Sequence, residues 1–230
     1  MNDNNNNYFT DYNFGDYDNS NIKSYRKVPM CLVVDTSGSM MQKDGTDRPK
    51  IEELNQNIMQ LISFIRNDAK AARICDLSII SFGGNVDIIS GYDSVDNIQF
   101  QPLKASGATP MGEAVMKAIE LLKIRRNYYR NNDIEHYKPI MLLMSDGAPT
   151  DQYSEAAQLM SSMVQNKELK IFPVGVGKSF DSSVLRMFSP TIEPKLIKDT
   201  SGFSMLFRLL SSSTSNPNDD SLEKWFNDEF

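Results

Sequence analysis

Oxygen-bearing side chains stand at alternate positions directly after the first long apolar run of the sequence. The run covers residues 30–34, and Asp35, Ser37 and Ser39 follow it. A carboxylate and two hydroxyls on one tight loop are hard oxygen donors, which are the ligands that magnesium and calcium prefer in proteins. Gly38, between the two serines, is expected to let the loop turn without a side chain in the way. This spacing predicts one half of a divalent-metal site.

A second aspartate and a threonine from distant segments are expected at the same place. Asp146 comes shortly after the apolar run 140–144, and Thr109 lies in a loop between the two aspartates. In a doubly wound sheet, ligands bind in the crevice at the carboxyl ends of the strands, where the strand order reverses. Because no histidine or cysteine accompanies these residues, the site favours magnesium, with manganese or calcium as alternatives, over zinc or copper. The candidate metal ligands are Asp35, Ser37, Ser39, Thr109 and Asp146.

The predicted site has an open coordination position, and this bears on function. Protein oxygens that act partly through water leave room for an outside ligand, and an Asp or Glu of a protein partner is the natural candidate. Two more aspartates, Asp44 and Asp151, are expected in loops that rim the same face, where they would tune which partner is accepted. We therefore expect a non-catalytic, metal-dependent protein-interaction module.

Two other functions stay open. An enzyme of phosphoryl transfer or hydrolysis would use the same ion, but it usually also needs a positioned base or a second ion. No such base stands out, because the only histidine, His136, is expected in a surface loop and no nucleophile-elbow motif is present. In the second alternative the chain is a scaffold whose tails recruit partners, and the ion only stabilises the loops.

Strands and helices must alternate along the chain to position these residues. Apolar runs of strand length alternate with segments whose apolar residues recur at helical spacing. This alternation predicts a mostly parallel sheet with helices on both faces, and the Gly83-Gly84 turn predicts a hairpin. The strands are expected at 30–34, 75–82, 86–90, 140–144 and 170–176, and the helices from Pro49 onward and over 111–126, 152–165, 180–188 and 202–210.

Two prolines indicate where helices begin. Pro49 fits the first position of one helix, and Pro110 fits the first position of another, with Thr109 as its N-cap. The candidate ligand Thr109 is therefore expected at the start of a helix. A polar insert is expected from Asn127 to Lys138, between that helix and the next strand.

The acidic charge of the chain lies in its two ends. The net charge is −6; residues 1–20 hold four Asp and no Lys or Arg, and residues 211–230 hold five acids and one Lys, so each end carries −4 and residues 21–210 are left with about +2. No basic stripe indicates nucleic-acid binding. No apolar run is long enough for a membrane span, and the acidic start is the reverse of a signal peptide. Cys31 and Cys75 lie in apolar runs, so we expect buried reduced thiols and a cytoplasmic protein.

The ends of the chain are expected to lie outside the folded domain of residues 23–212. Residues 1–22 are rich in Asn and Asp and are predicted to be a disordered leader. Residues 213–230 are predicted to be a flexible acidic tail with a short helix that places Trp225 and Phe226 on one face. Two interpretations of this helix stay open: it folds back on the core, or it inserts into a groove of a partner.

The separated parts of the site resemble a known family. The D-x-S-x-S run at 35–39, Thr109 and the strand-end Asp146 are similar to the metal-ion-dependent adhesion site (MIDAS) of von Willebrand factor A domains. The resemblance covers about residues 25–212. It implies a three-layer α/β/α Rossmann-like fold with a mostly parallel six-stranded sheet and one short antiparallel edge strand. It also implies hydroxyl ligation by Ser37, Ser39 and Thr109, with Asp35 and Asp146 holding the ion directly or through water.

Longer motifs resemble one branch of that family. Residues 28–40 (VPMCLVVDTSGSM), 107–114 (GATPMGEA), 137–151 (YKPIMLLMSDGAPTD) and 171–177 (IFPVGVG) are similar to the TerY-like branch, which is named from tellurium-resistance gene clusters. The resemblance implies a bacterial, intracellular protein of a stress-response or phage-defence system. It also implies a protein kinase or a PP2C-type phosphatase as partner. The Asn-rich leader and the acidic, Trp-bearing tail depart from the branch.

Overall fold

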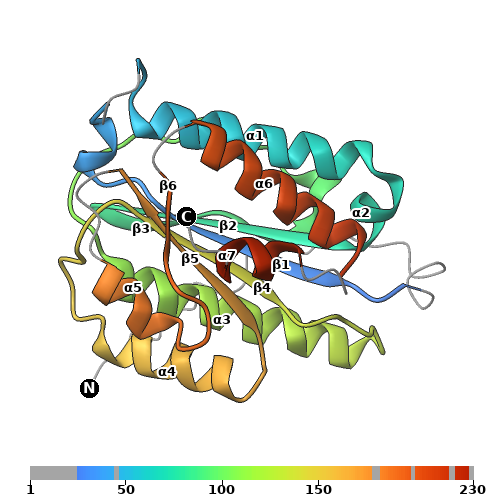
Figure 1. Cartoon of the computed structure of the whole chain (residues 1–230). Helices are drawn as coiled ribbons and strands as arrows, with labels where there is room; N and C mark the ends of the chain where they lie inside the picture. Colours follow the sequence, from blue (N-terminus) through green and yellow to red (C-terminus); the bar gives the residue numbers. More distant parts are fainter. Residues whose placement is uncertain (1–24, 44–46, 178–181, 198–199, 218–220, 228–230) are drawn as a thin grey trace, which may run out of the picture.

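A computed structural model describes residues 25–43, 47–177, 182–197, 200–217 and 221–227 (Figure 1). The predicted disordered leader, residues 1–22, and the candidate partner-binding residue Asp44 lie outside the described residues.

A six-stranded sheet forms the middle layer, in the order β3-β2-β1-β4-β5-β6. Neighbouring strands are parallel except β2 and β3, which form the predicted antiparallel hairpin. The edge strand β3 has ten residues and is longer than the expected 86–90. The pairing of β3 with β2 changes register near Ser78 and then continues to the end of β3. At this irregularity the Ser78 hydroxyl donates to the Ser90 carbonyl at 3.0 Å. The strands are β1 (Val28–Asp35), β2 (Cys75–Gly83), β3 (Asn85–Ser94), β4 (Ile140–Ser145), β5 (Lys170–Val176) and β6 (Lys195–Ile197).

The central strands β1 and β4 lie side by side and end at the same edge of the sheet. Every residue of both strands is buried, as their continuous apolar runs predict for strands covered on both faces. Their register pairs Val34 with Met144, so Asp35 and Ser145 follow at the same level. From β1 the chain adds β2 on one side, and from β4 it adds β5 on the other side. The crevice between β1 and β4 is therefore the point at which the strand order reverses, where such sheets bind ligands.

Helices cover both faces of the sheet (Figure 1). Helices α1, α2, α6 and α7 pack on one face, and α3, α4 and α5 pack on the other, each layer over its own apolar core. Among the described residues, no helix is long and apolar enough to cross a membrane. The helices are α1 (Lys50–Asn67), α2 (Ala69–Ile74), α3 (Met111–Asn131), α4 (Ser154–Gln165), α5 (Ser182–Phe188), α6 (Thr200–Ser215) and α7 (Ser221–Asn227).

The boundaries of α1 and α3 differ from the predicted ones. Helix α3 continues to Asn131, into the segment predicted to be a polar insert, because Arg125 and Tyr129 are buried on its inner face. Pro49 and Pro110 each lie one position before the helix and not at its first position, so Thr109 is not an N-cap.

Both cysteines are free and buried in β1 and β2, as predicted. Burial raises the pKa of the Cys31 thiol to about 12, so this group is protonated and unreactive at neutral pH.

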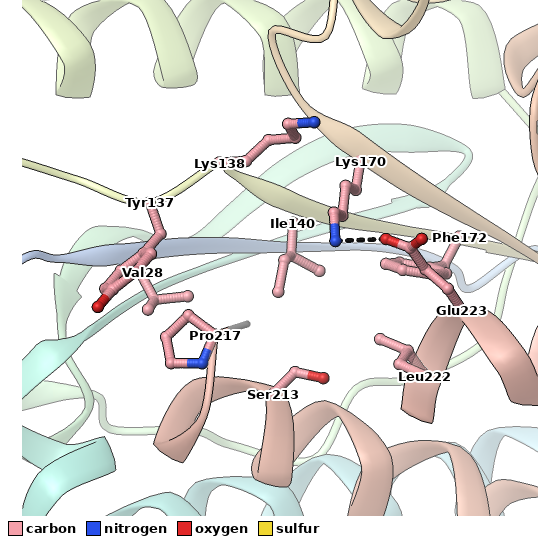
Figure 2. Close-up of a pocket in the computed structure, with 10 residues that line it drawn as sticks. All are labelled: Val28, Tyr137, Lys138, Ile140, Lys170, Phe172, Ser213, Pro217, Leu222 and Glu223. Atoms are coloured by element: carbon pink, nitrogen blue, oxygen red, sulfur yellow. Dashed lines mark ion pairs between the residues drawn. The ribbon is translucent and has the colours of Figure 1, made fainter. Parts of the chain in front are cut away.

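The C-terminal segment folds back on the domain, so the expected domain boundary at 212 is too early (Figure 2). Helix α6 extends to Ser215, and α7 buries Leu222 and Phe226, which are 2% and 4% exposed. The Phe226 ring lies 5.0 Å from the ring of Phe172 in β5. Residues 221–227 form the short helix that was predicted within the tail, and of its two interpretations the one in which the helix packs on the core is observed.

Ionic contacts hold α7 from both sides. Lys170 of β5 pairs with Glu223, and Figure 2 shows this pair beside a hollow of about 280 Å³ beneath the helix. The ammonium of Lys195 lies 4.4 Å from the centre of the Trp225 ring and also donates to the carbonyl of Trp225. Trp225 is partly buried by these contacts.

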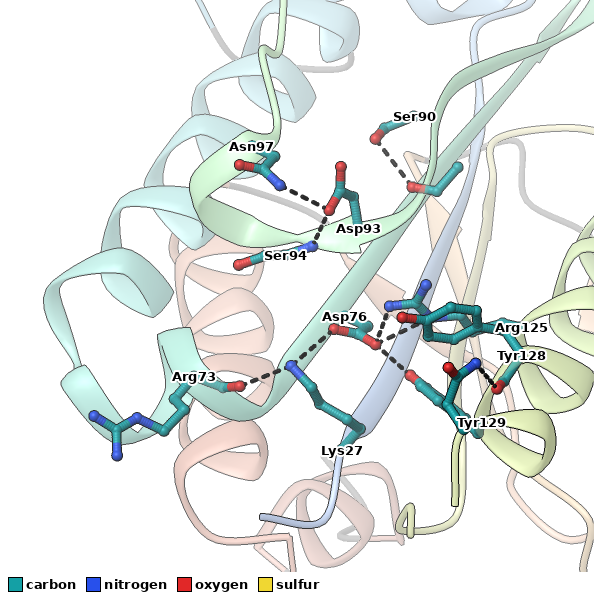
Figure 3. Close-up of polar contacts among 12 residues, drawn as sticks. Lys27, Arg73, Asp76, Ser90, Asp93, Ser94, Asn97, Arg125, Tyr128 and Tyr129 are labelled. Atoms are coloured by element: carbon teal, nitrogen blue, oxygen red, sulfur yellow. Dashed lines mark hydrogen bonds and ion pairs between the residues drawn. The ribbon is translucent and has the colours of Figure 1, made fainter. Parts of the chain in front are cut away.

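A buried ionic cluster lies near the start of β2, at the end of the sheet opposite the crevice between β1 and β4 (Figure 3). Asp76, near the start of β2, is fully buried. Its Oδ2 accepts from Arg125 Nη2 and from the Tyr129 hydroxyl, both at 2.5 Å, and its Oδ1 lies 3.3 Å from Lys27 Nζ. Lys27 also donates to the carbonyl of Arg73 at 2.8 Å. One acid and two cations thus tie β2, α3 and the segment just before β1 together.

Replacement of Asp76 should destabilise the domain. Asp76→Asn keeps the size of the side chain but leaves two buried cations without their anion, so we expect the free energy of unfolding to fall by about 3 kcal/mol. Urea denaturation followed by circular dichroism measures this. The control Asp87→Asn changes an exposed acid of β3 and should shift stability by no more than about 0.5 kcal/mol. Equal stability of the two variants would contradict a structural role for the cluster.

Replacement of Phe226 tests whether α7 belongs to the core. Phe226→Ala removes a buried ring from its contact with Phe172, so the free energy of unfolding should fall by about 3 kcal/mol in the same assay. Lys224→Ala, at an exposed position of the same helix, is the matched control and should change stability by about 0.5 kcal/mol at most. A Phe226 variant as stable as its control would mean that α7 does not pack on the domain.

Candidate metal centre

Asp35 is fully buried at the end of β1 and is held by two hydrogen bonds. Its Oδ1 accepts from the backbone N–H of Ser37 at 2.7 Å, and its Oδ2 accepts from the hydroxyl of Ser145 at 2.5 Å. Ser145 is the last residue of β4, so the carboxylate is fixed by both central strands. Ser145 was not among the predicted site residues, although its place directly before Asp146 is a signal in the sequence.

The side chains of Ser37 and Ser39 connect the two aspartates. Ser37 Oγ lies 3.0 Å from Ser39 Oγ, and Ser39 Oγ donates to Asp146 Oδ1 at 2.7 Å. The loop between them is a short 3-10 helix, Gly38–Met41, which is anchored by the buried Met40. Hydrogen bonds thus link four of the five predicted ligands in one series, in which Asp35 accepts from the backbone N–H of Ser37 and the other two contacts join side-chain oxygens.

Thr109, the fifth predicted ligand, is held at the same edge by backbone contacts. Its N–H donates to the hydroxyl of Thr150 at 2.9 Å, and its carbonyl accepts from the N–H of Thr150 at 3.0 Å. Two residues earlier, the carbonyl of Gly107 accepts from the N–H of Gly38 at 3.0 Å. The loop that carries Thr109 is therefore bonded directly to the loop that carries the two serines.

Glycine is needed where these loops touch. A Cβ on Gly83 would lie 2.2 Å from the carbonyl oxygen of Thr36. Gly107 has a φ of +73°, and its Cβ would lie 2.6 Å from the Cα of Gly84. At Gly38, in contrast, a Cβ would make an ordinary contact at 3.6 Å from Gly107 O, so the expected requirement at Gly38 is wrong. The requirement lies in the two neighbouring loops, where main chains approach closely.

Lys50 is a site residue that was not predicted. Its ammonium lies 2.7 Å from Asp146 Oδ2, and the two side chains are 5% and 0% exposed. Within the described residues that oxygen accepts no well-directed hydrogen bond, so the contact is an ion pair. A lysine at the first position of a helix opposes the helix dipole, and helix preferences therefore gave no reason to expect it there.

The site is short of positive charge. Asp35, Asp146 and Lys50 together carry a formal charge of −1 in a buried setting. Burial raises the pKa of the Asp35 carboxyl, and the negative charge of Asp146 adds to this, while hydrogen bonds from Ser145 and Ser37 oppose it. A bound cation would relieve both unfavourable effects.

The donor set fits a hard divalent cation. Two carboxylates and three hydroxyls are oxygen donors, which suit magnesium, manganese or calcium. No group of three or more His, Cys, Asp or Glu side chains that could hold a metal gathers anywhere among the described residues, and this site has only two such side chains, Asp35 and Asp146. The hydroxyls are thus essential to the proposed ligand set.

The other predicted partner-binding residues lie in different settings. Asp151 accepts from the N–H groups of Gly112 and Glu113 at 3.1 and 2.8 Å, so it caps α3 in place of Thr109. Trp225 and Phe226 lie on α7 near the start of β5, away from the carboxyl ends of the strands, and Phe226 is too buried to meet a partner.

The raised pKa of Asp35 predicts a pH dependence of stability without metal. The folded state holds the Asp35 proton more tightly than the unfolded chain, so its contribution to stability is fully present below the ordinary Asp value near 3.8 and is lost as the pH rises through the raised pKa. Asp35→Asn removes this loss, because its amide can donate to Ser145 while the Ser145 hydroxyl donates to the Gly147 carbonyl, 3.1 Å away. In EDTA, the variant should therefore gain stability relative to wild type as the pH rises above the ordinary Asp value near 3.8. Urea curves across this range measure the difference. If the stabilities of Asp35→Asn and of wild type changed with pH in parallel, the raised pKa of Asp35 would be contradicted. Asp96→Asn, at an exposed site, is the control.

Known structures share this fold. The proximal thread matrix protein 1 of the mussel byssus, with a zinc-occupied MIDAS motif, aligns with a TM-score of 0.57 and 13% identity over 84% of this chain and 47% of that chain. The manganese-loaded TRAP protein of Plasmodium vivax aligns with a TM-score of 0.55 and 19% identity over 78% and 71%. A von Willebrand factor type A protein from Catenulispora acidiphila aligns with a TM-score of 0.58 and 15% identity over 83% and 43%. This chain thus spans about half the length of the mussel protein, and at these identities the likeness shows the fold.

Sequence comparison gives the family. No curated protein matches the chain. Residues 30–205, more than half of the sequence, match the family model of the von Willebrand factor type A domain. The matched range begins in β1 and ends within α6, so it contains all five candidate ligands. The chain therefore belongs to the von Willebrand factor type A domain family.

Proposed function

We propose that this chain is a metal-dependent protein-interaction module that binds a carboxylate of a protein partner. One observation carries the proposal: a continuous series of hydrogen bonds through Ser37 and Ser39 joins Asp35 to Asp146 at the switch point of the sheet. The metals of two structural relatives, zinc in the mussel protein and manganese in the Plasmodium vivax protein, support a divalent ion at this place. Magnesium is the ion that we expect here, with manganese or calcium as alternatives.

Each candidate ligand has a distinct task in this proposal. The hydroxyls of Ser37, Ser39 and Thr109 would offer neutral oxygens, and Asp35 and Asp146 would offer charge, directly or through water. When bound, the ion would supply a positive centre with one position open to an outside oxygen. The hydrogen bonds from Ser145 and Ser37 orient Asp35, so that the ligand set is formed before any partner arrives.

The charge of the site favours an acidic partner residue. The buried groups carry −1 with Lys50 included, and a divalent ion would change this to +1. A partner carboxylate at the open position would then make the centre neutral. Removal of the ion would leave that carboxylate facing a negative site, so binding would be switched by the metal.

We propose further that the module is not an enzyme. Hydrolysis at a single metal usually needs a base within hydrogen-bond reach of the attacking water. His136, the only histidine of the chain, bridges to Lys27 just before β1, whereas the site follows the other end of that strand. Eight strand residues separate the two ends by about 26 Å. Asp151, a nearby acid, is engaged in capping α3.

The finer proposals rest on the sequence motifs. Residues 28–40 and 137–151 resemble the TerY-like branch, and they form the strands and loops that carry Asp35 and Asp146. We therefore propose a cytoplasmic role in a bacterial stress-response or phage-defence system. A protein kinase or a PP2C-type phosphatase is the proposed partner.

Removal of one hydroxyl tests the function. Thr109→Val keeps the shape of the side chain but removes an oxygen, so magnesium affinity should fall by about tenfold or more, and capture of the partner should fall with it. Calorimetry measures the affinity, and affinity purification with magnesium, followed by elution with EDTA, identifies the partner. Thr191→Val, at an exposed position outside the site, is the matched control and should behave as wild type. Capture of the same partner by Thr109→Val in EDTA would refute the proposal.

A further inference from the structure

We propose that Lys50 is a built-in counter-cation of the metal site, which holds Asp146 in the metal-free protein and competes with the metal for it. Lys50 would thus set the metal concentration at which the site loads. The inference rests on the proposed function and adds a regulatory residue to it.

The contact is placed where it must affect a metal. Asp146 uses Oδ1 to accept from Ser39, a candidate ligand, and its Oδ2 faces Lys50 at 2.7 Å. Both side chains are almost completely buried, so water screens the ion pair poorly. Because Oδ2 receives no well-directed hydrogen bond from the described residues, it still has lone pairs to offer a metal. Metal and ammonium therefore draw on the same carboxylate.

The position of Lys50 is fixed by the fold. Its backbone N–H donates to the carbonyl of Gln42 at 3.0 Å, at the end of the serine-bearing loop. The next turns of α1 are anchored in the core by Ile51 and Leu54, which are 5% and 0% exposed. Lys50 lies at the positive end of the helix dipole, which disfavours a cation, while Asp146 attracts it. The attraction of Asp146 therefore accounts for a lysine at this position, whereas the helix dipole does not.

The charge balance gives two opposite effects. Without Lys50, the two aspartates would present −2 to a metal, and the ion would bind more tightly. With Lys50, the metal binds more weakly, but the loaded site carries +1 and attracts a partner carboxylate. Lys50 would thus weaken metal binding and strengthen the attraction of the loaded site for a partner carboxylate.

Neutral substitutions separate these effects. Lys50→Met keeps a long unbranched side chain without the charge, and Lys50→Gln introduces a neutral amide that can donate to Asp146. Both should bind magnesium about tenfold more tightly in calorimetry, which corresponds to about 1.4 kcal/mol. In EDTA, Lys50→Met should melt at a lower temperature than wild type. Lys50→Arg, which keeps the charge, should bind magnesium within about twofold of wild type, as should Lys224→Met at an exposed site.

The outcomes separate the two proposals. Magnesium affinity of Lys50→Gln equal to or weaker than that of wild type would overturn the role of Lys50 and leave the metal site standing. Tight binding by the neutral variants with none by wild type would support the role of Lys50 and refute metal-dependent function of the natural chain. No binding by any of the proteins, with circular dichroism showing that they are folded, would overturn both. If Lys50→Met does not fold in EDTA, the Lys50→Gln titration decides.

Discussion

The structure depends on one electrostatic constraint: two aspartates, Asp35 and Asp146, are buried side by side at the ends of the central strands. Like charges in a buried site repel each other, and each loses hydration. Nearby groups stabilise both carboxylates. Ser37 and Ser145 donate hydrogen bonds to Asp35, and Ser39 and Lys50 contact Asp146. These contacts leave a deficit of one positive charge. The loops around the strand ends therefore hold a buried cluster of side chains with a net negative charge.

The two ends of the sheet solve the problem of buried charge differently. At the amino end, Asp76 meets Arg125 and Lys27, so cations outnumber the acid and the remaining charge is positive, which does not attract a metal ion. At the carboxyl end, acids outnumber the cation. Burial alone therefore does not distinguish a structural cluster from a binding site. The sign of the remaining charge does, together with the exposure of Ser39, which is only partly buried and gives access from the surface.

Local patterns predicted five of the six strands and brought forward the candidate ligands, because both depend on short segments; the three-residue strand β6 is too short to show such a pattern. The apolar runs that became β1 and β4 show burial on both faces, and the alternation in 35–39 places oxygens on one loop. Lys50, the close approaches of Gly83 and Gly107 and the capping by Asp151 depend on residues distant in sequence, so no local period contains them. The helix at 221–227 was expected, but its direction of packing was not decided by its sequence. The same apolar face would suit the core or a partner.

The packing of α7 bears on the scaffold alternative, in which the tail recruits partners. Recruitment through the apolar face of α7 would have to expose Leu222 and Phe226 and break the pair between Lys170 and Glu223. A partner would first have to compensate for that loss. The site at the strand ends needs no such rearrangement, because its loops are already bonded to one another and its remaining charge attracts a cation. Of the two surfaces, the one formed around Asp35 and Asp146 is therefore the less costly place for a partner to bind.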